Sequence, residues 1–405
     1  MWKSIRRNIL ELFEVFVHEF RLVGHDGGLI LFFTFLPLVY PVVYSLIYNP
    51  EVVRDVPIVV VDHDRTARSR ELARKIDATQ ETWVKGYAAD LGEARRAMAS
   101  QDCFGILEIP EGFDRRIGRG ETAQAVIYSD MTLLLRYKAM LVSATSVMEE
   151  MGAEIQQETI SRIPMAGAFE TEPDADLLPI HNIPMGNIVS GFDSFIMPGV
   201  IVLILHQCII LACGMAGGAK RENPGVIGYR SFNEQPSVWM TMLGQMLCYF
   251  TILILPTIYL IHYIPIMFRF PVESDTLEVF AFLLPMVIAC LSLGFCLQGV
   301  VWERETVFVI WVVTSVAFLF LSGITWPRYA MPWPWKALGS IIPGTWGVEG
   351  FIRMSSNGAS IAQVRDCYIN LWILAGIYTV AAYFVQRYVV RPSVRERVLA
   401  ERTFS

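Results

Sequence analysis

The chain carries little charge for its length. Asp, Glu, Lys and Arg make up 18% of the 405 residues, whereas hydrophobic residues make up 54%. A soluble domain ordinarily has about a quarter charged residues, so this composition favours a membrane protein. The sequence also lacks a concentrated basic face, which argues against a nucleic-acid partner.

Motifs for catalysis are also missing. The stretch GSIIPGTWG (339–347) has neither the lysine nor the following hydroxyl of a phosphate-binding loop. The six histidines are scattered and suggest no Ser-His-Asp arrangement. We therefore expect no catalytic residue, no metal site and no cofactor in this chain, and no ATP hydrolysis by it alone.

The seven cysteines show neither metal-binding nor disulfide spacing. Five of them fall in apolar runs, where cysteine behaves as a small apolar residue. Cys103 and Cys367 lie outside those runs, and a disulfide between them stays an open alternative without positive support.

What the chain does have is long apolar runs. Six of them approach the length that crosses a bilayer, about 20 residues; they are 29–48, 195–219, 238–263, 279–301, 306–326 and 368–386. Pro37 and Pro41 lie inside the first run, which spanning helices tolerate when neighbouring groups satisfy the freed carbonyls. We predict a membrane α-helical fold with six transmembrane helices.

The distribution of Lys and Arg predicts the orientation. Cytoplasmic loops are enriched in these residues, and they gather before the first run, after the second and after the last. We therefore expect both termini in the cytoplasm and residues 49–192, where acidic residues outnumber basic ones, outside. Residues 4–21 have apolar side chains at helical spacing, which predicts an amphipathic helix on the inner leaflet or against a partner protein.

Residues 49–192 alternate strand-like and helix-like patterns, which predicts an α/β domain inserted between transmembrane helices 1 and 2. The first strand ends in Asp62, His63 and Asp64. Two carboxylates and an imidazole could hold a metal, but aspartate at a strand-to-helix junction usually caps backbone N–H groups. We predict caps, and a partner or substrate surface is the third interpretation.

Two stretches resemble the type-2 ABC exporter permeases. The first runs from VVVDHDRTARSREL to AQAVIYSD and resembles the extracytoplasmic domain of that family, with Ile109, Pro110, Phe113 and Gly120 in matching places. The second, FLSGITWPRYAMPWPWKALGSIIPGTWGVEGFIRM, resembles the block around its fifth span. The order of one span, a large outer domain and five more spans also matches, so the resemblance covers nearly the whole chain.

The resemblance implies a permease subunit in the bacterial cytoplasmic (inner) membrane that forms the translocation pathway of an exporter as a dimer. ATP and Mg would lie on a partner ABC ATPase subunit. The second permease would be a copy or a paralogue, and a periplasmic adaptor is left open. A non-transporting scaffold or receptor that uses its outer domain for protein contacts is the alternative function.

The predicted layout is a cytoplasmic amphipathic helix (1–28), transmembrane helix 1 (29–48), an extracytoplasmic α/β domain (49–192), transmembrane helices 2–6 (193–390) and a cytoplasmic tail (391–405). Helices 2–6 include a coupling loop (219–237) and a re-entrant outer region (327–367). The coupling loop departs from the family pattern, because Pro224 and Gly225 replace its Gly-Thr.

Three groups of candidate site residues follow. The residues expected to couple to the ATPase are Lys220, Arg221, Glu222, Arg230, Glu303, Arg304 and Glu305. The polar residues expected within spans, either along a pathway or in helix–helix hydrogen bonds, are His206, Gln207, Gln245 and Gln298. The residues expected at an outer gate are Ser322, Gly323, Pro327, Pro332 and Pro343, and an interfacial aromatic belt without a gate is the alternative there.

Overall fold

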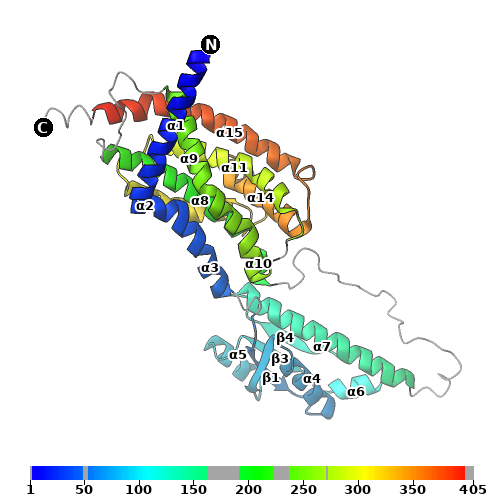
Figure 1. Cartoon of the computed structure of the whole chain (residues 1–405). Helices are drawn as coiled ribbons and strands as arrows, with labels where there is room; N and C mark the ends of the chain where they lie inside the picture. Colours follow the sequence, from blue (N-terminus) through cyan, green and yellow to red (C-terminus); the bar gives the residue numbers. More distant parts are fainter. Residues whose placement is uncertain (1, 49–52, 162–190, 223–236, 271, 397–405) are drawn as a thin grey trace. The chain divides into compact units, whose positions relative to one another are not determined.

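The computed structural model describes the chain except for residues 1, 49–52, 162–190, 223–236, 271 and 397–405. Contacts divide the chain into two compact units. The helical unit comprises Met1–Asn49 and Pro184–Ser405, and the α/β unit comprises Pro50–Ile183 (Figure 1).

A four-stranded mixed sheet forms the centre of the α/β unit. Its strands follow the order β2-β1-β3-β4 and are β1 (Val56–Asp62), β2 (Thr82–Tyr87), β3 (Gly105–Ile109) and β4 (Val126–Ser129). β1 pairs in parallel with β2 and β3, and β3 pairs antiparallel with β4. The inner strand β1 is buried on both faces, which explains its uninterrupted run of Val and Ile.

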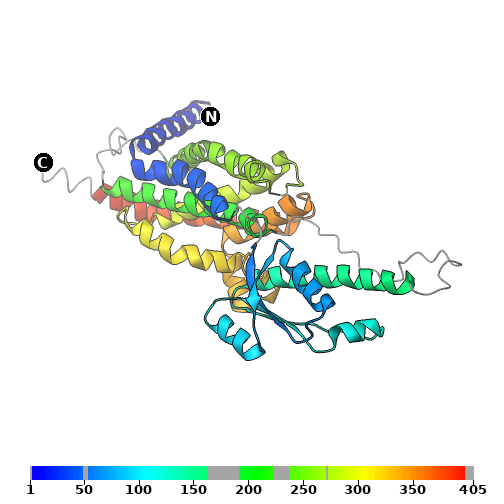
Figure 2. The ribbon, with the colours of Figure 1, turned by 90° about the horizontal axis from the view of Figure 1, so that it is seen from below.

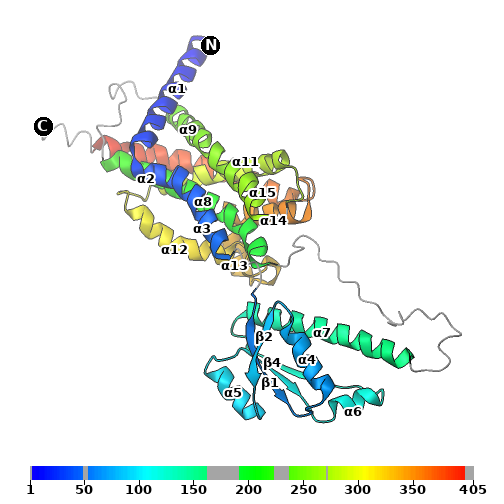
Figure 3. The same cartoon turned by 60° about the horizontal axis from the view of Figure 1, so that its bottom comes forward.

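Helices cover both faces of this sheet, as the alternating sequence pattern predicted (Figure 3). Ile58 and Val60 enter one core, and Val59 and Val61 enter the other, because successive strand residues point to opposite faces. The first core is covered by α4 (Ala67–Asp77), α6 (Phe113–Gly118) and α7 (Leu134–Ser161), and the second by α5 (Leu91–Ala99). The short helix α6 was not predicted from the sequence.

Asp62 and Asp64 cap backbone groups, as predicted. The Asp64 carboxylate accepts hydrogen bonds from three successive N–H groups at 112–114, where α6 begins, at 2.8–3.1 Å. Asp62 accepts from the backbone N–H groups of residues 64 and 65 at 3.0 and 2.8 Å, and from the Ser69 hydroxyl at 2.7 Å. Burial raises the pKa of Asp64, but the hydrogen bonds from Thr66 and the start of α6 outweigh it and hold that pKa below its ordinary value.

Among the described residues, five helices are long and apolar enough to cross a membrane: Gly27–Tyr48, Phe192–Glu222, Val238–Phe268, Thr276–Leu297 and Arg365–Glu396. They correspond to five of the six predicted spans. The sixth predicted span, 306–326, contains α12 (Thr306–Leu321). Its 16 residues extend only about 24 Å at ~1.5 Å per residue, less than the roughly 30 Å of a hydrocarbon core. A sixth crossing therefore stays a prediction.

Besides α12, the helical unit contains elements that form these spans, precede them or connect them. They are α1 (Trp2–His25), α2 (Gly27–Ile30), η1 (Leu31–Phe35), α3 (Leu36–Tyr48), α8 (Phe192–Glu222), α9 (Val238–Ile258), η4 (Tyr259–Tyr263), α10 (Ile264–Phe268), α11 (Thr276–Leu297), η5 (Arg328–Ala330), α13 (Trp333–Ser340), α14 (Pro343–Asn357), α15 (Arg365–Val385) and η6 (Gln386–Val390). η1, η4 and η6 are π-helical turns. Pro37 follows the first and Pro265 follows the second, and proline lacks the N–H that a regular helix needs.

α8 is the central helix of this unit. It contacts α3, α11, α12 and α14 and is buried along most of its length (Figure 2). A helix enclosed on all sides is expected to be apolar all round, and IVLILHQCIILACGMAGGA is nearly so. Its few polar side chains are therefore candidates for a functional or bonding role.

The amphipathic helix α1 packs on α9 through a stripe that includes Val15 and Glu19. Val15 and Glu19 are fully buried. Ile9, Phe13 and Phe20, three of the apolar side chains at helical spacing in 4–21, are each more than half exposed. This open apolar stripe suits a lipid surface or a partner protein, so both alternatives from the sequence stand.

Candidate functional site

The charged end of α8 is bonded to several other parts of the helical unit. We call this cluster the α8 junction; its residues are Glu19, Asp26, Lys220, Arg221, Glu222, Gln245, Tyr249, Gln298, Arg304 and Ser393. Lys220 and Arg221 lie in the last turn of α8, where the helix dipole favours positive charge.

The first part of the junction is a buried ion pair. Lys220 Nζ lies 2.5 Å from Glu19 Oε1, and Glu19 has no exposed surface. The Gln245 amide and the Tyr249 hydroxyl each donate a hydrogen bond of 2.8 Å to the same carboxylate. Burial raises the pKa of Glu19, but Lys220 and these hydrogen bonds outweigh it, so its pKa is lowered and it is charged at neutral pH. The carboxylate thereby connects α1 to α8 and α9.

The second part is Arg221, which is completely buried. Its guanidinium donates to the carbonyl oxygens of Gln298, at 2.6 Å, and of Val301, both just beyond the end of α11. Its Nε donates to the Ser393 hydroxyl at 3.0 Å. A cation here satisfies carbonyls that the end of a helix leaves free. Arg221 thus joins α8 to α11 and to the C-terminal helix.

The third part is Arg304, in the turn of residues 302–305. Its backbone N–H and its Nε donate to Glu222 at 2.7 and 2.5 Å, and its Nη1 lies 3.1 Å from Asp26. Asp26 in turn accepts from two N–H groups of α2. A Cβ on Gly218 would lie 2.8 Å from the Arg304 backbone N, so the turn touches the backbone of α8 where only glycine leaves room.

The two glutamates of this turn face solvent. Glu303 and Glu305 are exposed and form no ion pair with any described residue. Trp302 is half-exposed, and its ring centre lies 4.9 Å from the Arg221 guanidinium. Beside Arg304 lies a cavity of about 390 Å³, lined by His18, Arg21, Leu22, His25, Asp26, Ala219 and Arg304. In this turn, Arg304 is therefore paired within the helical unit, whereas the carboxylates of Glu303 and Glu305 are accessible to a partner protein.

The structure brings most of the predicted coupling residues to one place. Lys220, Arg221, Glu222 and Arg304 belong to the junction, and Glu303 and Glu305 flank it. Arg230 lies outside the described residues, as does most of the predicted coupling loop.

Sequence reasoning missed Glu19, Asp26, Tyr249 and Ser393. Glu19 could have been noticed, because Val15, Glu19 and Val23 lie four residues apart and so share one face of a helix.

Three of the predicted pathway residues, Gln207, Gln245 and Gln298, make hydrogen bonds between helices. Gln245 donates to Glu19, as described above. The Gln298 amide donates to the Cys213 carbonyl at 2.7 Å, and its oxygen accepts from Gln386 at 2.7 Å. Bonds of this kind were one of the two alternatives from the sequence. Contact with a transported molecule stays a prediction for these residues.

His206 and Gln207 lie in the middle of α8. Gln207 Oε1 accepts from the Trp311 indole N–H at 3.1 Å. His206 is fully buried, and its ring nitrogens have no hydrogen-bond partner among the described residues. Its ring meets Phe318 edge-on at 5.2 Å, and a Cβ on Gly344 would lie 2.9 Å from its Cγ. α14 therefore comes close to α8 at this histidine.

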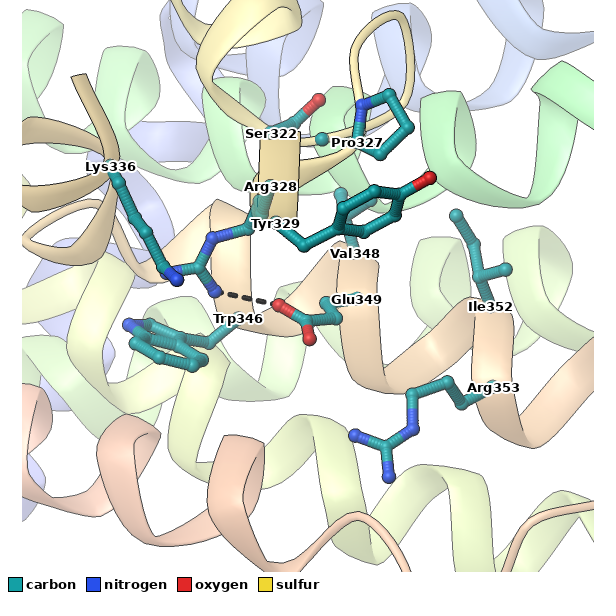
Figure 4. A pocket seen from close by; sticks show the side chains of 11 residues that line it. Ser322, Pro327, Arg328, Tyr329, Lys336, Trp346, Val348, Glu349, Ile352 and Arg353 are labelled. Carbon is teal, nitrogen blue, oxygen red and sulfur yellow. Dashed lines mark hydrogen bonds and ion pairs between the residues drawn. The ribbon is translucent and has the colours of Figure 1, made fainter. Parts of the chain in front are cut away.

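Three of the predicted gate residues line a single cavity of about 470 Å³: Ser322, Gly323 and Pro327 (Figure 4). Pro332 immediately precedes α13, and Pro343 is the first residue of α14. Proline at the start of a helix loses no hydrogen bond, so these two prolines define where the helices begin. A gating role stays a prediction.

Arg328 is the most enclosed charged side chain of this cavity, being 10% exposed. Its Nη1 pairs with Glu349 at 2.6 Å, its Nη2 donates to Ser340 at 2.9 Å, and its guanidinium lies 4.1 Å from the ring centre of Trp346 (Figure 4). Gly323 has a φ of +93°, and a Cβ there would lie 3.0 Å from Arg328 Cγ. Glycine at this position thus permits the positive φ of the turn and leaves room for the Arg328 side chain.

One group of described residues has the composition of a metal site. Ligand atoms of Glu349, Asp366 and Cys367 lie within 4.8 Å of one another. The guanidinium of Arg353 is 3.2 Å from Asp366 and 3.9 Å from the Cys367 sulfur. This cation already supplies positive charge to the group, so we assign no metal to it.

Spanning helices around a central α8, with charged residues bonded at its end, define a multi-pass membrane protein. The family model described as ABC-2 family transporter protein matches residues 28–384. The chain therefore belongs to the ABC-2 family transporter proteins, which confirms the resemblance seen in its motifs. A search of curated proteins finds no match.

Proposed function

We propose that this chain is the permease subunit of an ATP-driven exporter, and that it acts as a dimer with a separate ATPase subunit that binds ATP and Mg. The family supports a membrane subunit of a transporter. The proposal adds the direction of transport, the partner and the site of coupling. It also places both termini and the α8 junction in the cytoplasm of a bacterium, in accord with the distribution of Lys and Arg.

The turn of residues 302–305 is the observation that carries this proposal. Its outer side presents Glu303 and Glu305, neither of which forms an ion pair with a described residue, and the exposed half of Trp302, whose ring also lies 4.9 Å from the Arg221 guanidinium. Its inner side is bonded through Arg304 to Glu222 and Asp26. Exposed acidic and aromatic groups are suited to docking, because rim charges guide encounter and a tryptophan anchors contact.

Displacement of this turn would reach several helices at once. Arg304 is bonded to the end of α8 and to the start of α2. The neighbouring Val301 carbonyl is held by Arg221, which also holds the C-terminal helix. Packed elements move as rigid bodies rather than deforming continuously. A partner that moves the turn would therefore tilt the first, second and last spans together.

Charge reversal on the outer side of the turn tests this coupling. We expect E303K/E305K to reduce the ATPase subunit that co-purifies with the chain by about tenfold, which corresponds to the loss of about 1.4 kcal/mol. The melting temperature should stay unchanged, because neither side chain has a partner within the described chain. E273K is the matched control, since Glu273 is exposed at the other end of the unit, just before α11.

Full co-purification of the ATPase with E303K/E305K would contradict the role of the turn. If the wild-type chain itself brings down no ATPase, the scaffold or receptor function becomes the better explanation.

A further inference from the structure

The cavity bounded by Ser322 and Arg353 contains a positive charge that no described residue balances. Arg328 is paired with Glu349, and Arg353 is paired with Asp366 at 3.2 Å. Lys336 also lines the cavity, and it has no ion pair with any described residue. Figure 4 shows Lys336 and Trp346 on one side of the cavity and Ile352 and Arg353 on the other.

A second observation also indicates a missing acceptor. The Nε atom of Arg328 is buried and has no hydrogen-bond partner among the described residues, although the other two guanidinium nitrogens are bonded. A buried donor without an acceptor is costly, the more so on a charged group. Arg328 lines the cavity, but Nε has no exposed surface, so an acceptor bound in the cavity can take up this N–H only after a shift of the Arg328 side chain.

The surroundings indicate the depth of the cavity in a membrane. Trp333 and Trp335, on the same short helix α13 as Lys336, are 79% and 58% exposed, and Tyr329 is 87% exposed. Exposed tryptophan and tyrosine gather at the level of lipid headgroups. A lysine among them would place its ammonium at the level of lipid phosphates.

We propose that this cavity binds the phosphate headgroup of an anionic amphiphile, with the Lys336 ammonium and the Arg328 Nε–H as donors and Trp346 and Tyr329 beside it. The inference rests on the proposed function for one point only, that this end of the helical unit faces the outer leaflet. A volume of about 470 Å³ holds a headgroup and leaves the apolar chains outside, against the exposed tryptophans.

The test uses the purified full chain in a neutral detergent and measures lipid binding by native mass spectrometry. The probes are dihexanoylphosphatidylglycerol, dihexanoylphosphatidylcholine and inorganic phosphate. We expect K336Q to weaken binding of the phosphatidylglycerol by about tenfold, as loss of one charge-assisted hydrogen bond implies, and K336R to keep binding within about threefold. R269Q is the control: it removes an exposed cation at the same end of the unit but outside the cavity.

Equal phosphatidylglycerol affinity for K336Q and the wild type, or an equal loss in R269Q, would overturn the inference. So would equal affinity of the wild type for both lipids. Displacement of phosphatidylglycerol by excess inorganic phosphate would support the site and assign it to the phosphate alone, whereas no displacement would support it and assign it to the whole amphiphile. Absence of an ATPase partner would remove the proposed function and leave this binding result intact.

Discussion

Removal of the Glu19 charge should destabilise the helical unit strongly. Glu19 is fully buried, Lys220 is 11% exposed in its side chain, and the two are 2.5 Å apart. In E19Q the lysine would stay enclosed without a counter-ion, which costs about 3–5 kcal/mol for a buried pair. The amide keeps the shape of the carboxylate, so the effect reports charge rather than packing. E14Q is the matched control on the exposed side of α1 and should change stability by less than about 0.5 kcal/mol.

A double-mutant cycle separates the pair from its surroundings. K220M should also destabilise, but E19Q/K220M should cost less than the sum of the single changes, with a coupling energy of about 1–3 kcal/mol. Unfolding can be followed with a thiol-reactive dye, because all seven cysteines are free and six are buried. Additive effects of E19Q and K220M would refute the pair, as would a melting temperature for E19Q equal to that of E14Q.

Three further predictions follow. In the α/β unit, D64N should speed hydrogen exchange of the backbone amides at 113–118. Folding lowers the pKa of Asp64, so the stabilisation from its carboxylate is present above about pH 4 and is lost as the pH falls through the folded pKa. The difference in exchange rate between D64N and the wild type should therefore become smaller in acid. G218A should lower the melting temperature by pushing residues 302–305 off α8, at a cost of about 1–3 kcal/mol, whereas G24A, which meets no atom within 4 Å, should not. In the variants E303C and K336C, the new cysteines should react with an impermeant maleimide from opposite sides of the membrane. Reaction of both from the same side would contradict the predicted topology.

Much of the fold could be predicted from local sequence patterns. Five spans follow from the length of their apolar runs, and the four strands follow from short apolar segments that alternate with helix-like segments. α6 escaped prediction because it is short and its N-terminus depends on Asp64, some 50 residues earlier in the chain. α12 ends at Leu321, within the predicted run, and the turn after it includes Gly323 with its positive φ.

The candidate site was only half predictable. Positive-inside counting found Lys220, Arg221 and Arg304 because charge next to a span is a local signal. Their partners were not visible, since Glu19 and Gln245 meet only when α1 packs on α9. The bonds of Gln298 could not be told from pathway lining for the same reason: sequence gives the polarity of a side chain and not its partner.

The measurement that tests the central claim most directly is purification of the tagged chain from its native membrane in mild detergent, followed by mass spectrometry of the proteins that accompany it. A stoichiometric soluble subunit with a phosphate-binding loop is the predicted result. A clean preparation without any ATPase, also after gentle crosslinking, would contradict an ATP-driven permease.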